Sequence, residues 1–244
     1  MNPSESVSLD DLRSIASLLG TAPDPRTQTS LPPAAVRDTT RTDALVAWLV
    51  GLIDQTDPIS RGHSWRVSRL VDLAARTMGL PTAERRSVTQ AALLHDVGKI
   101  VIPRVLLRKP ASLRAEEFSI VQRHAELGAR ILCGMPALAD AAPVARWHHE
   151  RWDGGGYPGN LAGEHIPLAA RLVSVLDAFD AMTSPRAYHE PIPATDALEE
   201  LRAHSGTQFD PQLVALVCAL DLDPLLEEFE RIGASNACTN QIAA

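Results

Sequence analysis

The features that mark a secreted, membrane-spanning or disulfide-stapled protein are missing from this sequence of 244 residues. Its three cysteines, Cys133, Cys218 and Cys238, lie far apart and form no CxxC pair, which argues against a disulfide framework and a zinc knuckle. No segment is apolar for long enough to cross a bilayer, and the N-terminus has no basic region ahead of an apolar run. We therefore expect a cytoplasmic protein in a reducing compartment, without a membrane span.

Positive charge is also in short supply. The 23 Lys and Arg residues are outnumbered by 30 Asp and Glu residues, so the formal net charge is -7. Binding to a nucleic-acid polymer depends on clustered Lys and Arg, which release counterions from the phosphates, so we expect no such partner. An anionic substrate must instead be attracted locally, by metal ions and a few well-placed cations.

Strand signals are nearly absent as well. The densest β-branched run, at residues 100–102, is stopped at once by Pro103, which cannot donate to a strand ladder. From Asp43 onward, apolar residues recur instead at steps of three and four residues, the period of an amphipathic helix. The sequence therefore predicts an all-α fold, with helices over about residues 83–97, 114–132, 137–149, 168–182, 194–204 and 210–220.

Proline and glycine divide the chain into three predicted regions. Residues 1–42 contain a short amphipathic helix at Ser8–Leu19 and then a proline-rich linker without helical or strand period. Residues 43–232 form the main helical domain. Residues 233–244 are expected to be a disordered tail.

Histidines occur on apolar faces of several predicted helices. His63 and His124 share their faces with aliphatic side chains, so both rings are expected to face the interior. The pair His95–Asp96 lies at a helix end, just before Gly98. Such a position suits a pair of metal ligands, because both side chains project from the end of an element.

Four further side chains extend this pattern. An ionised Asp177 on an apolar helix face is costly to bury unless a cation compensates its charge. Asp180, one turn on, is either an acceptor for a ligating histidine or an ordinary solvated carboxylate. His148 and His149 are adjacent, so their directions on a helix differ by about 100 degrees. They cannot chelate as an i, i+4 pair does, but each can serve a different ion of a two-metal centre.

Each of these residues alone has a simpler explanation, since an Asp often bonds a neighbouring His and a buried His often bonds a backbone carbonyl. Together they are difficult to explain as independent accidents, and they predict a buried metal centre. The candidate ligands are His63, His95, Asp96, His124, His148, His149 and Asp177. With imidazole as the main donor and no thiolate, this set suits iron, manganese, nickel, cobalt or zinc.

Several long motifs follow one another in a characteristic order. They are HDVGKI at residues 95–100, FSIVQRH at 118–124, HHERWDGGGYP at 148–158, ARLVSVLDAFDAMTS at 170–184 and GTQFDP at 206–211. This order resembles the HD-GYP subgroup of HD-domain phosphohydrolases, from about Asp43 to Leu220. The resemblance implies an HD-domain helical bundle with a buried centre of two or three metals. It also implies hydrolysis of the bacterial second messenger cyclic di-GMP to pGpG, and in some members on to GMP.

The resemblance also implies roles for individual residues. It assigns all seven candidate ligands to the metal centre, with Asp96 as the bridging carboxylate and a catalytic residue. Lys99 matches a catalytic lysine beside the scissile phosphate, and Arg186 matches a phosphate-binding arginine. Tyr157 of the Gly-Tyr-Pro motif and Asp153 ahead of it are the other predicted substrate-binding residues.

Three positions depart from the family pattern. Members with three metals carry a glutamate four residues before the first histidine ligand, where this sequence has Ile59, so we expect two metals and pGpG as the main product. His189 replaces a residue that is often basic, which predicts weaker phosphate binding near neutral pH. Asn160 stands where glycine is usual after the Tyr-Pro turn, and asparagine tolerates a left-handed backbone.

These inferences leave three functions open. The leading one is a cyclic di-GMP phosphodiesterase with two divalent transition-metal ions, iron or manganese first and zinc, nickel or cobalt as alternatives. The second is an HD phosphohydrolase of another cyclic nucleotide, and the third is a non-catalytic module that binds cyclic di-GMP or docks on a partner. Residues 1–42 are too short for a sensory domain, so a diguanylate cyclase or a sensor protein is the candidate partner.

Overall fold

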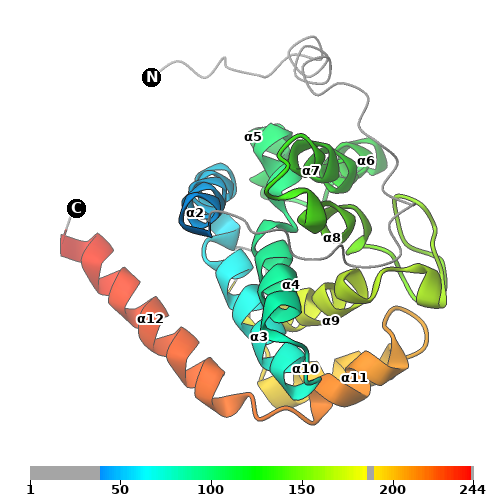
Figure 1. The fold of residues 1–244 in the computed structure, drawn as a ribbon. Helices are drawn as coiled ribbons and strands as arrows, with labels where there is room; N and C mark the ends of the chain where they lie inside the picture. Colours follow the sequence, from blue (N-terminus) through cyan, green and yellow to red (C-terminus); the bar gives the residue numbers. More distant parts are fainter. Residues whose placement is uncertain (1–38, 186–189, 243–244) are drawn as a thin grey trace.

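The computed structural model describes residues 39–185 and 190–242, and within these ranges the chain forms helices and no β-strand (Figure 1). The elements, with η for a 3-10 helix, are α2 (Thr39–Thr56), η2 (Pro58–Ser60), α3 (His63–Thr77), α4 (Thr82–Leu94), η3 (Val97–Val101), α5 (Arg104–Leu107), α6 (Ala115–Gln122), α7 (His124–Cys133), η4 (Ala139–Ala141), α8 (Ala142–Trp147), η5 (Gly163–His165), α9 (Leu168–Thr183), α10 (Ala194–Ala203), α11 (Pro211–Cys218) and α12 (Asp223–Ile242). The predicted all-α fold is confirmed.

The core forms where the middle helices of the bundle meet. α3 packs against α4 and α9, while α8 lies against α7 and α9. Apolar side chains at steps of three and four residues line the inner face of α3, including the fully buried Val67, Leu70 and Val71. The same face carries His63, and the buried face of α9 carries Asp180, so the helix periods that build the core also bring polar groups into it.

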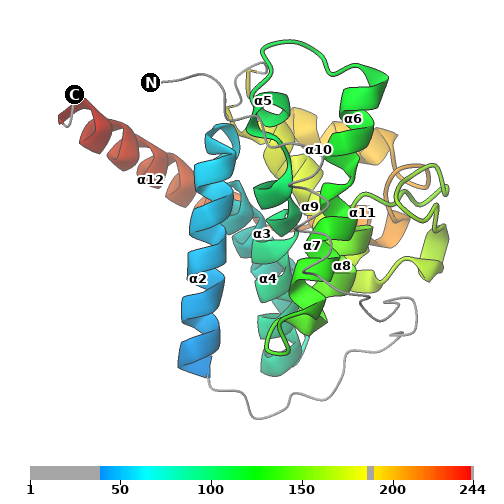
Figure 2. The same ribbon diagram turned by 90° about the horizontal axis from the view of Figure 1, so that it is seen from above.

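α12 extends away from the bundle in both Figure 1 and Figure 2. Its first half is attached to α3 by an ion pair of 2.9 Å between Arg69 and Glu228 and by an edge contact between the rings of Trp65 and Phe229. We predicted a disordered tail from residue 233, whereas the helix continues to Ile242. No proline interrupts this stretch, and extending an existing helix costs much less than starting one.

The start of α2 and the end of α4 differ from the sequence predictions. α2 begins at Thr39, so the last residues of the predicted linker are already helical. α4 ends at Leu94 rather than continuing to residue 97, because the chain tightens into the 3-10 helix η3. His95 and Asp96 therefore occupy the turn between the two elements.

Two predicted long helices are divided in the structure. The expected helix over 114–132 becomes α6 and α7, because the N–H of Arg123 bonds to the carbonyl of Ile120 in the tighter 3-10 pattern. The expected helix over 137–149 is reduced to η4 and α8. Pro143 has no N–H donor and lies in the first turn of α8, where that loss is harmless.

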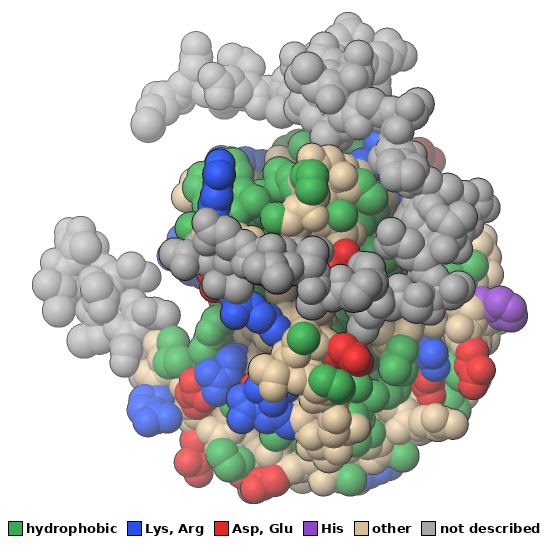
Figure 3. All heavy atoms as spheres, in the orientation of Figure 1, with side chains coloured by type: hydrophobic (Ala, Val, Ile, Leu, Met, Phe, Trp, Pro, Cys, Tyr) green, Lys and Arg blue, Asp and Glu red, His purple; other side chains and the backbone are tan. Residues whose placement is uncertain are grey.

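Some predictions lie outside the described residues. These are the helix at Ser8–Leu19, most of the linker, and the side chains of Arg186 and His189. Within the described part of the chain, no helix combines the length and hydropathy that a membrane span requires. Basic and acidic side chains lie interspersed on the face shown in Figure 3, in agreement with the view that an anion must be attracted locally.

Candidate metal centre

The predicted ligands converge in two adjoining clusters. The His63 cluster consists of His63, His95 and Asp177, and the His124 cluster consists of Asp96, His124, His148 and His149. Within each cluster, one ligand atom from every residue lies within 4.8 Å of the others. The structure therefore brings together all seven residues that the sequence singled out.

Helix ends supply most of these side chains. His63 and His124 are the first residues of α3 and α7, and His148 directly follows α8. Only Asp177 lies in the middle of a helix, on the stretch of α9 that faces α3. A residue at a helix end can reach the common centre without displacing the apolar side chains that fill the core behind it.

Gly98 allows the chain to bring Asp96 next to His124. A Cβ atom at Gly98 would lie 1.9 Å from the carbonyl oxygen of His124 and 2.6 Å from the backbone nitrogen of Gly128. Contacts this short do not occur in folded proteins, so any side chain at this position would push η3 away from α7. The approach of these two elements is thus a condition for the His124 cluster.

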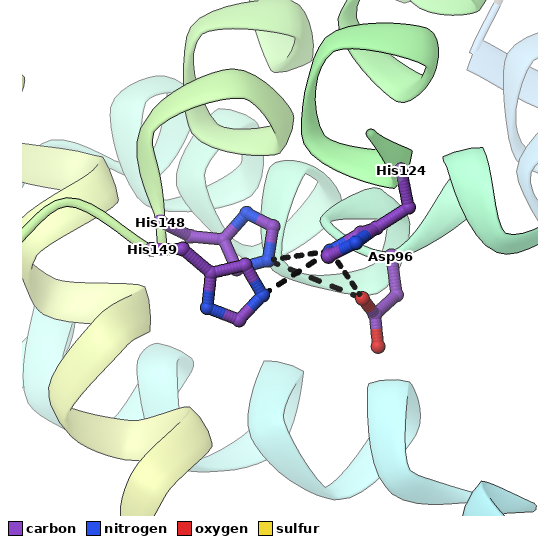
Figure 4. Close-up of side chains that lie close together, drawn as sticks. All are labelled: Asp96, His124, His148 and His149. Atoms are coloured by element: carbon purple, nitrogen blue, oxygen red, sulfur yellow. Dashed lines mark hydrogen bonds and ion pairs between the residues drawn. The ribbon is translucent and has the colours of Figure 1, made fainter. Parts of the chain in front are cut away.

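The rings of the His124 cluster point their Nε2 atoms at one common place (Figure 4). Nδ1 of His124 donates to the carbonyl of Val121 at 2.7 Å, and Nδ1 of His148 donates to the carbonyls of Val144 and Ala145 at 3.1 Å. A carbonyl can only accept, so each Nδ1 carries the proton and each Nε2 offers a lone pair.

The spacing of these nitrogens fits a bound cation. Nε2 of His124 lies 3.1 Å from Nε2 of His149 and 3.5 Å from Nε2 of His148. Two ligand atoms that each lie about 2.1 Å from one ion are separated by about 3 to 3.5 Å, which matches this arrangement.

His95 provides an independent sign of a metal site. Its Nδ1 donates to the carbonyl of Ala92 at 2.7 Å, whereas its Nε2 is buried and has no hydrogen-bond partner. A buried nitrogen without a partner is costly, and a cation would satisfy it. The donor set, with imidazoles and carboxylates and no thiolate, therefore fits divalent transition metals.

In the His63 cluster, one histidine is held between two carboxylates. Nε2 of His63 lies 2.9 Å from Asp177, and Nδ1 donates to Asp180 at 2.6 Å. The guanidinium of Arg66 donates two hydrogen bonds, of 2.6 and 3.0 Å, to the same Asp180 carboxylate. Of the two alternatives for Asp180, the acceptor for a candidate ligand is confirmed, because its side chain is buried and bonded to His63.

The histidines of the two clusters differ in their acid–base behaviour. Burial alone would lower the pKa of His63, but the carboxylates of Asp177 and Asp180 outweigh it and raise the pKa to about 9. Burial and the neighbouring His124 lower the pKa of His149 to about 3. Burial likewise lowers the pKa of His124 and of His148, so these imidazoles are neutral bases near pH 7.

Asp96 belongs to the His124 cluster and also reaches His95 of the His63 cluster. One of its oxygens is 3.3 Å from Nε2 of His124, and the other is 3.4 Å from Nε2 of His95. The ammonium of Lys99 is 2.7 Å from Asp96 and 3.6 Å from the buried Asp57. Burial would raise the pKa of Asp96, but opposing influences, of which the ammonium of Lys99 is the largest, hold this pKa well below its usual range, so the carboxylate is ionised.

The Gly-Tyr-Pro motif forms a loop that lies against the His124 cluster. The ring of Tyr157 stacks on the ring of His149, with centroids 4.8 Å apart. Burial, together with the charges of Asp96 and Asp177, raises the pKa of the Tyr157 hydroxyl, which therefore stays protonated. The backbone N–H of Tyr157 also bonds to the carbonyl of His149, so the loop and the histidine pair hold each other in place.

Asn160 has the left-handed backbone that we predicted, with φ of 54°. Its amide donates to the carbonyl of Gly156 at 2.6 Å, which closes the turn. The buried carboxylate of Glu150 accepts the backbone N–H groups of Gly159 at 2.6 Å and Leu161 at 3.0 Å. The turn therefore survives the replacement of glycine by asparagine.

One expectation for the site differs from the structure, and another stays a prediction. His148 and His149 belong to the same cluster rather than to different ones, because both lie in the turn after α8 and not on a regular helix. The carboxylate of Asp153 pairs with Arg151 at 2.7 Å and accepts the N–H of Gly155 at 2.9 Å. These contacts stabilise the turn, and the role of Asp153 in substrate binding stays a prediction.

Comparison with known proteins identifies the family. Residues 48–213 match the family model described as HD domain. The chain belongs to the HD-domain family, and its recognition as an HD-GYP protein is confirmed.

Two curated relatives and one solved structure show the likeness of this HD domain. A protein named cyclic di-GMP phosphodiesterase from Thermotoga maritima is 40% identical over 172 residues, which are 70% of this chain and 47% of that protein. A 3'3'-cGAMP-specific phosphodiesterase of Vibrio cholerae is 37% identical over 175 residues, which are 71% of this chain and 34% of that protein. A crystal structure of another Vibrio cholerae cyclic GMP-AMP-specific phosphodiesterase has a TM-score of 0.55 at 22% identity and covers 75% of this chain and 48% of that one.

The chain thus spans less than half the length of these curated relatives. The sequence did not single out three residues that support the centre, namely Asp57, Arg66 and Glu150. Arg66 lies one helical turn after His63, and Glu150 directly follows the histidine pair, so their positions beside candidate ligands were the available signal. Charged residues are common at such positions, and only burial and partners distinguish these three.

Proposed function

We propose that this HD domain is a metal-dependent phosphodiesterase that hydrolyses cyclic di-GMP to pGpG. The observation that carries the proposal is Asp96, which belongs to one cluster of candidate ligands, reaches His95 of the other at 3.4 Å and pairs with Lys99 at 2.7 Å. A centre for two cations with one fixed ammonium beside it is complementary to a phosphodiester that gains negative charge during hydrolysis. The relative from Thermotoga maritima, named a cyclic di-GMP phosphodiesterase, supports this choice of substrate.

The two clusters would hold two divalent ions, for which iron or manganese is our first choice. Such ions supply a water of lowered pKa and neutralise the phosphoryl oxygens. The imidazoles of His124, His148 and His149 are neutral, so the positive charge at the His124 cluster would come from the cation. Ile59 cannot ligate a third ion, which favours pGpG over GMP as the main product.

Lys99 contributes charge rather than a proton. Burial alone would lower its pKa, but the carboxylates of Asp96 and Asp57 outweigh this and raise it. An ammonium whose pKa lies above its ordinary value is a poor proton donor at neutral pH and a permanent positive charge. We therefore assign Lys99 to the neutralisation of a phosphoryl oxygen in the transition state.

Product analysis tests this function. Protein purified without oxygen and loaded with ferrous iron or manganese is incubated with cyclic di-GMP, and the products are separated by chromatography. We expect pGpG from the wild type and none from Asp96→Ala. Metal-loaded wild-type protein that releases no product with either ion would contradict the proposal and favour a binding module.

A second candidate substrate is 3'3'-cGAMP. The specific support is the relative of 37% identity from Vibrio cholerae, whose name gives that dinucleotide as its substrate. The two substrates share the phosphodiester and one guanine, so the metal centre alone does not discriminate between them. Competition between equal amounts of the two dinucleotides, followed by product analysis, gives the ratio of their kcat/KM values directly.

A further inference from the structure

Phe118 is an exposed aromatic residue near the metal centre. Its side chain is 47% exposed, and α6, on which it lies, has no buried side chain, so the ring adds nothing to the core. One exposed apolar residue needs no explanation by itself. This ring, however, meets the ring of Tyr157 edge to face, with centroids 6.4 Å apart and an angle of 81° between the planes.

Phe118 is the outermost member of a row of three rings. Tyr157 stacks on His149 at 4.8 Å and 27°, and His149 belongs to the His124 cluster. The row therefore leads from the candidate ligands through Tyr157 to the half-exposed ring of Phe118.

Local contacts at its start and the connection to α7 at its end position the helix that carries Phe118. Glu117 accepts the backbone N–H of Arg114 at 2.8 Å and pairs with the ammonium of Lys109, which fixes the start of α6. α6 leads directly into α7, whose first residue is His124. An aromatic ring on a fixed helix binds a flat ligand with little loss of its own conformational freedom.

We propose that Phe118, together with the edge of Tyr157, is the platform on which one nucleobase of the bound cyclic dinucleotide stacks. This inference rests on the proposed function and adds a substrate-binding residue to it. Every base has a π-face, so aromatic stacking is tolerant of base type. Phe118 accordingly sets the affinity for cyclic dinucleotides in general and does not select guanine over adenine.

Kinetics of Phe118→Ala provide the first test. Loss of one stacking contact should raise KM for cyclic di-GMP about tenfold, and that for 3'3'-cGAMP equally. The value of kcat and the metal content should not change, because Phe118 touches no candidate ligand. Phe118→Trp should restore KM. Trp48→Ala is the matched control, since Trp48 is also an exposed aromatic, 58% accessible, and lies on α2, well apart from α6 in Figures 1 and 2.

A fluorescence measurement reports the stacking itself. A phosphorothioate cyclic dinucleotide with 2-aminopurine in place of one base should be quenched on binding to the wild type and to Trp48→Ala, but much less on binding to Phe118→Ala. Unchanged KM and unchanged quenching in Phe118→Ala would overturn the platform while leaving the phosphodiesterase intact. Absence of turnover in the wild type would instead overturn the proposed function. The quenching measurement would then test the platform by itself, and failure of the wild type to bind the dinucleotide would overturn the platform too.

Discussion

One histidine of the metal centre, His63, is held by a different means from His95, His124 and His148, whose Nδ1 atoms donate to backbone carbonyls. In the His124 cluster, Nδ1 of His124 and of His148 donates to backbone carbonyls of the chain just before each residue. In the His63 cluster, Nδ1 of His63 donates to the carboxylate of Asp180, which Arg66 holds in turn. A carbonyl acceptor is present whatever the side chains are, whereas the arrangement at His63 depends on two charged side chains, the buried Asp180 and the partly buried Arg66.

This difference sets the charge of the imidazoles. A neutral carbonyl does little to stabilise an imidazolium in a buried place, and the pKa values of His124 and His148 fall below their ordinary value. Two carboxylates stabilise the imidazolium of His63 and raise its pKa to about 9. The His124 cluster is therefore ready to bind a cation, whereas His63 of the other cluster must first release a proton.

The largest effect is expected from Asp96→Ala, because Asp96 touches both clusters. Turnover should fall by more than about 100-fold, the upper range for residues that only support a ligand. At least one metal should be lost, as measured by elemental analysis per chain. Asp72→Ala, which removes a carboxylate paired with Arg76 and Arg85 outside the centre, should leave both values unchanged. Full metal content and an unchanged rate in Asp96→Ala would contradict the assignment of Asp96 to the metal centre.

Asp180→Asn should affect one half of the centre alone. The amide keeps the size of the side chain but lacks the charge that holds His63 and Arg66, so affinity at the His63 cluster should fall about 10- to 100-fold. The ion of the His124 cluster should bind as before. Calorimetric titration with manganese separates the two binding steps, and equal weakening of both would show that the halves are coupled rather than independent.

The two halves should also differ in their dependence on pH. Without metal, His63 is protonated below its pKa of about 9, and it must lose this proton to bind a cation. Affinity at the His63 cluster should therefore rise about tenfold per pH unit from neutral pH up to that value. The His124 cluster should change little above pH 6.5, since the pKa values of its histidines are lowered from that value.

Titration at pH 7 in buffers of different ionisation enthalpy measures the protons released. We expect one proton from the His63 cluster and none from the His124 cluster. Equal release from both clusters would contradict the assigned protonation states.

Arg66→Lys should produce the smallest change. Lysine keeps the positive charge but not the planar pair of hydrogen bonds to Asp180, so affinity at the His63 cluster should fall by less than about tenfold. Arg69→Lys is the matched control on the same helix, because Arg69 pairs with Glu228 of α12 and not with the centre. A loss as large as in Asp180→Asn would show that Arg66, and not the carboxylate charge, holds His63.

The candidate ligands could be selected from the sequence, but their grouping into two clusters could not. His148 and His149 show why, since helical geometry sends adjacent side chains in different directions, whereas the chain leaves the helix at this point and both rings reach one cluster. Residues of ordinary type were missed altogether. Phe118 differs from the other phenylalanines of the described chain through its exposure and its contact with Tyr157.

The sequence by itself determined the fold class, the seven candidate ligands and the HD-GYP family, because helical period, side-chain chemistry and motif order are local properties. The tertiary structure decided which ligands share a cluster, which acceptor holds each imidazole and hence which histidine carries a proton. Those properties depend on how closely helices far apart in the chain approach one another. The contact of Gly98 with His124 and the reach of Asp180 from α9 to His63 on α3 are two such approaches.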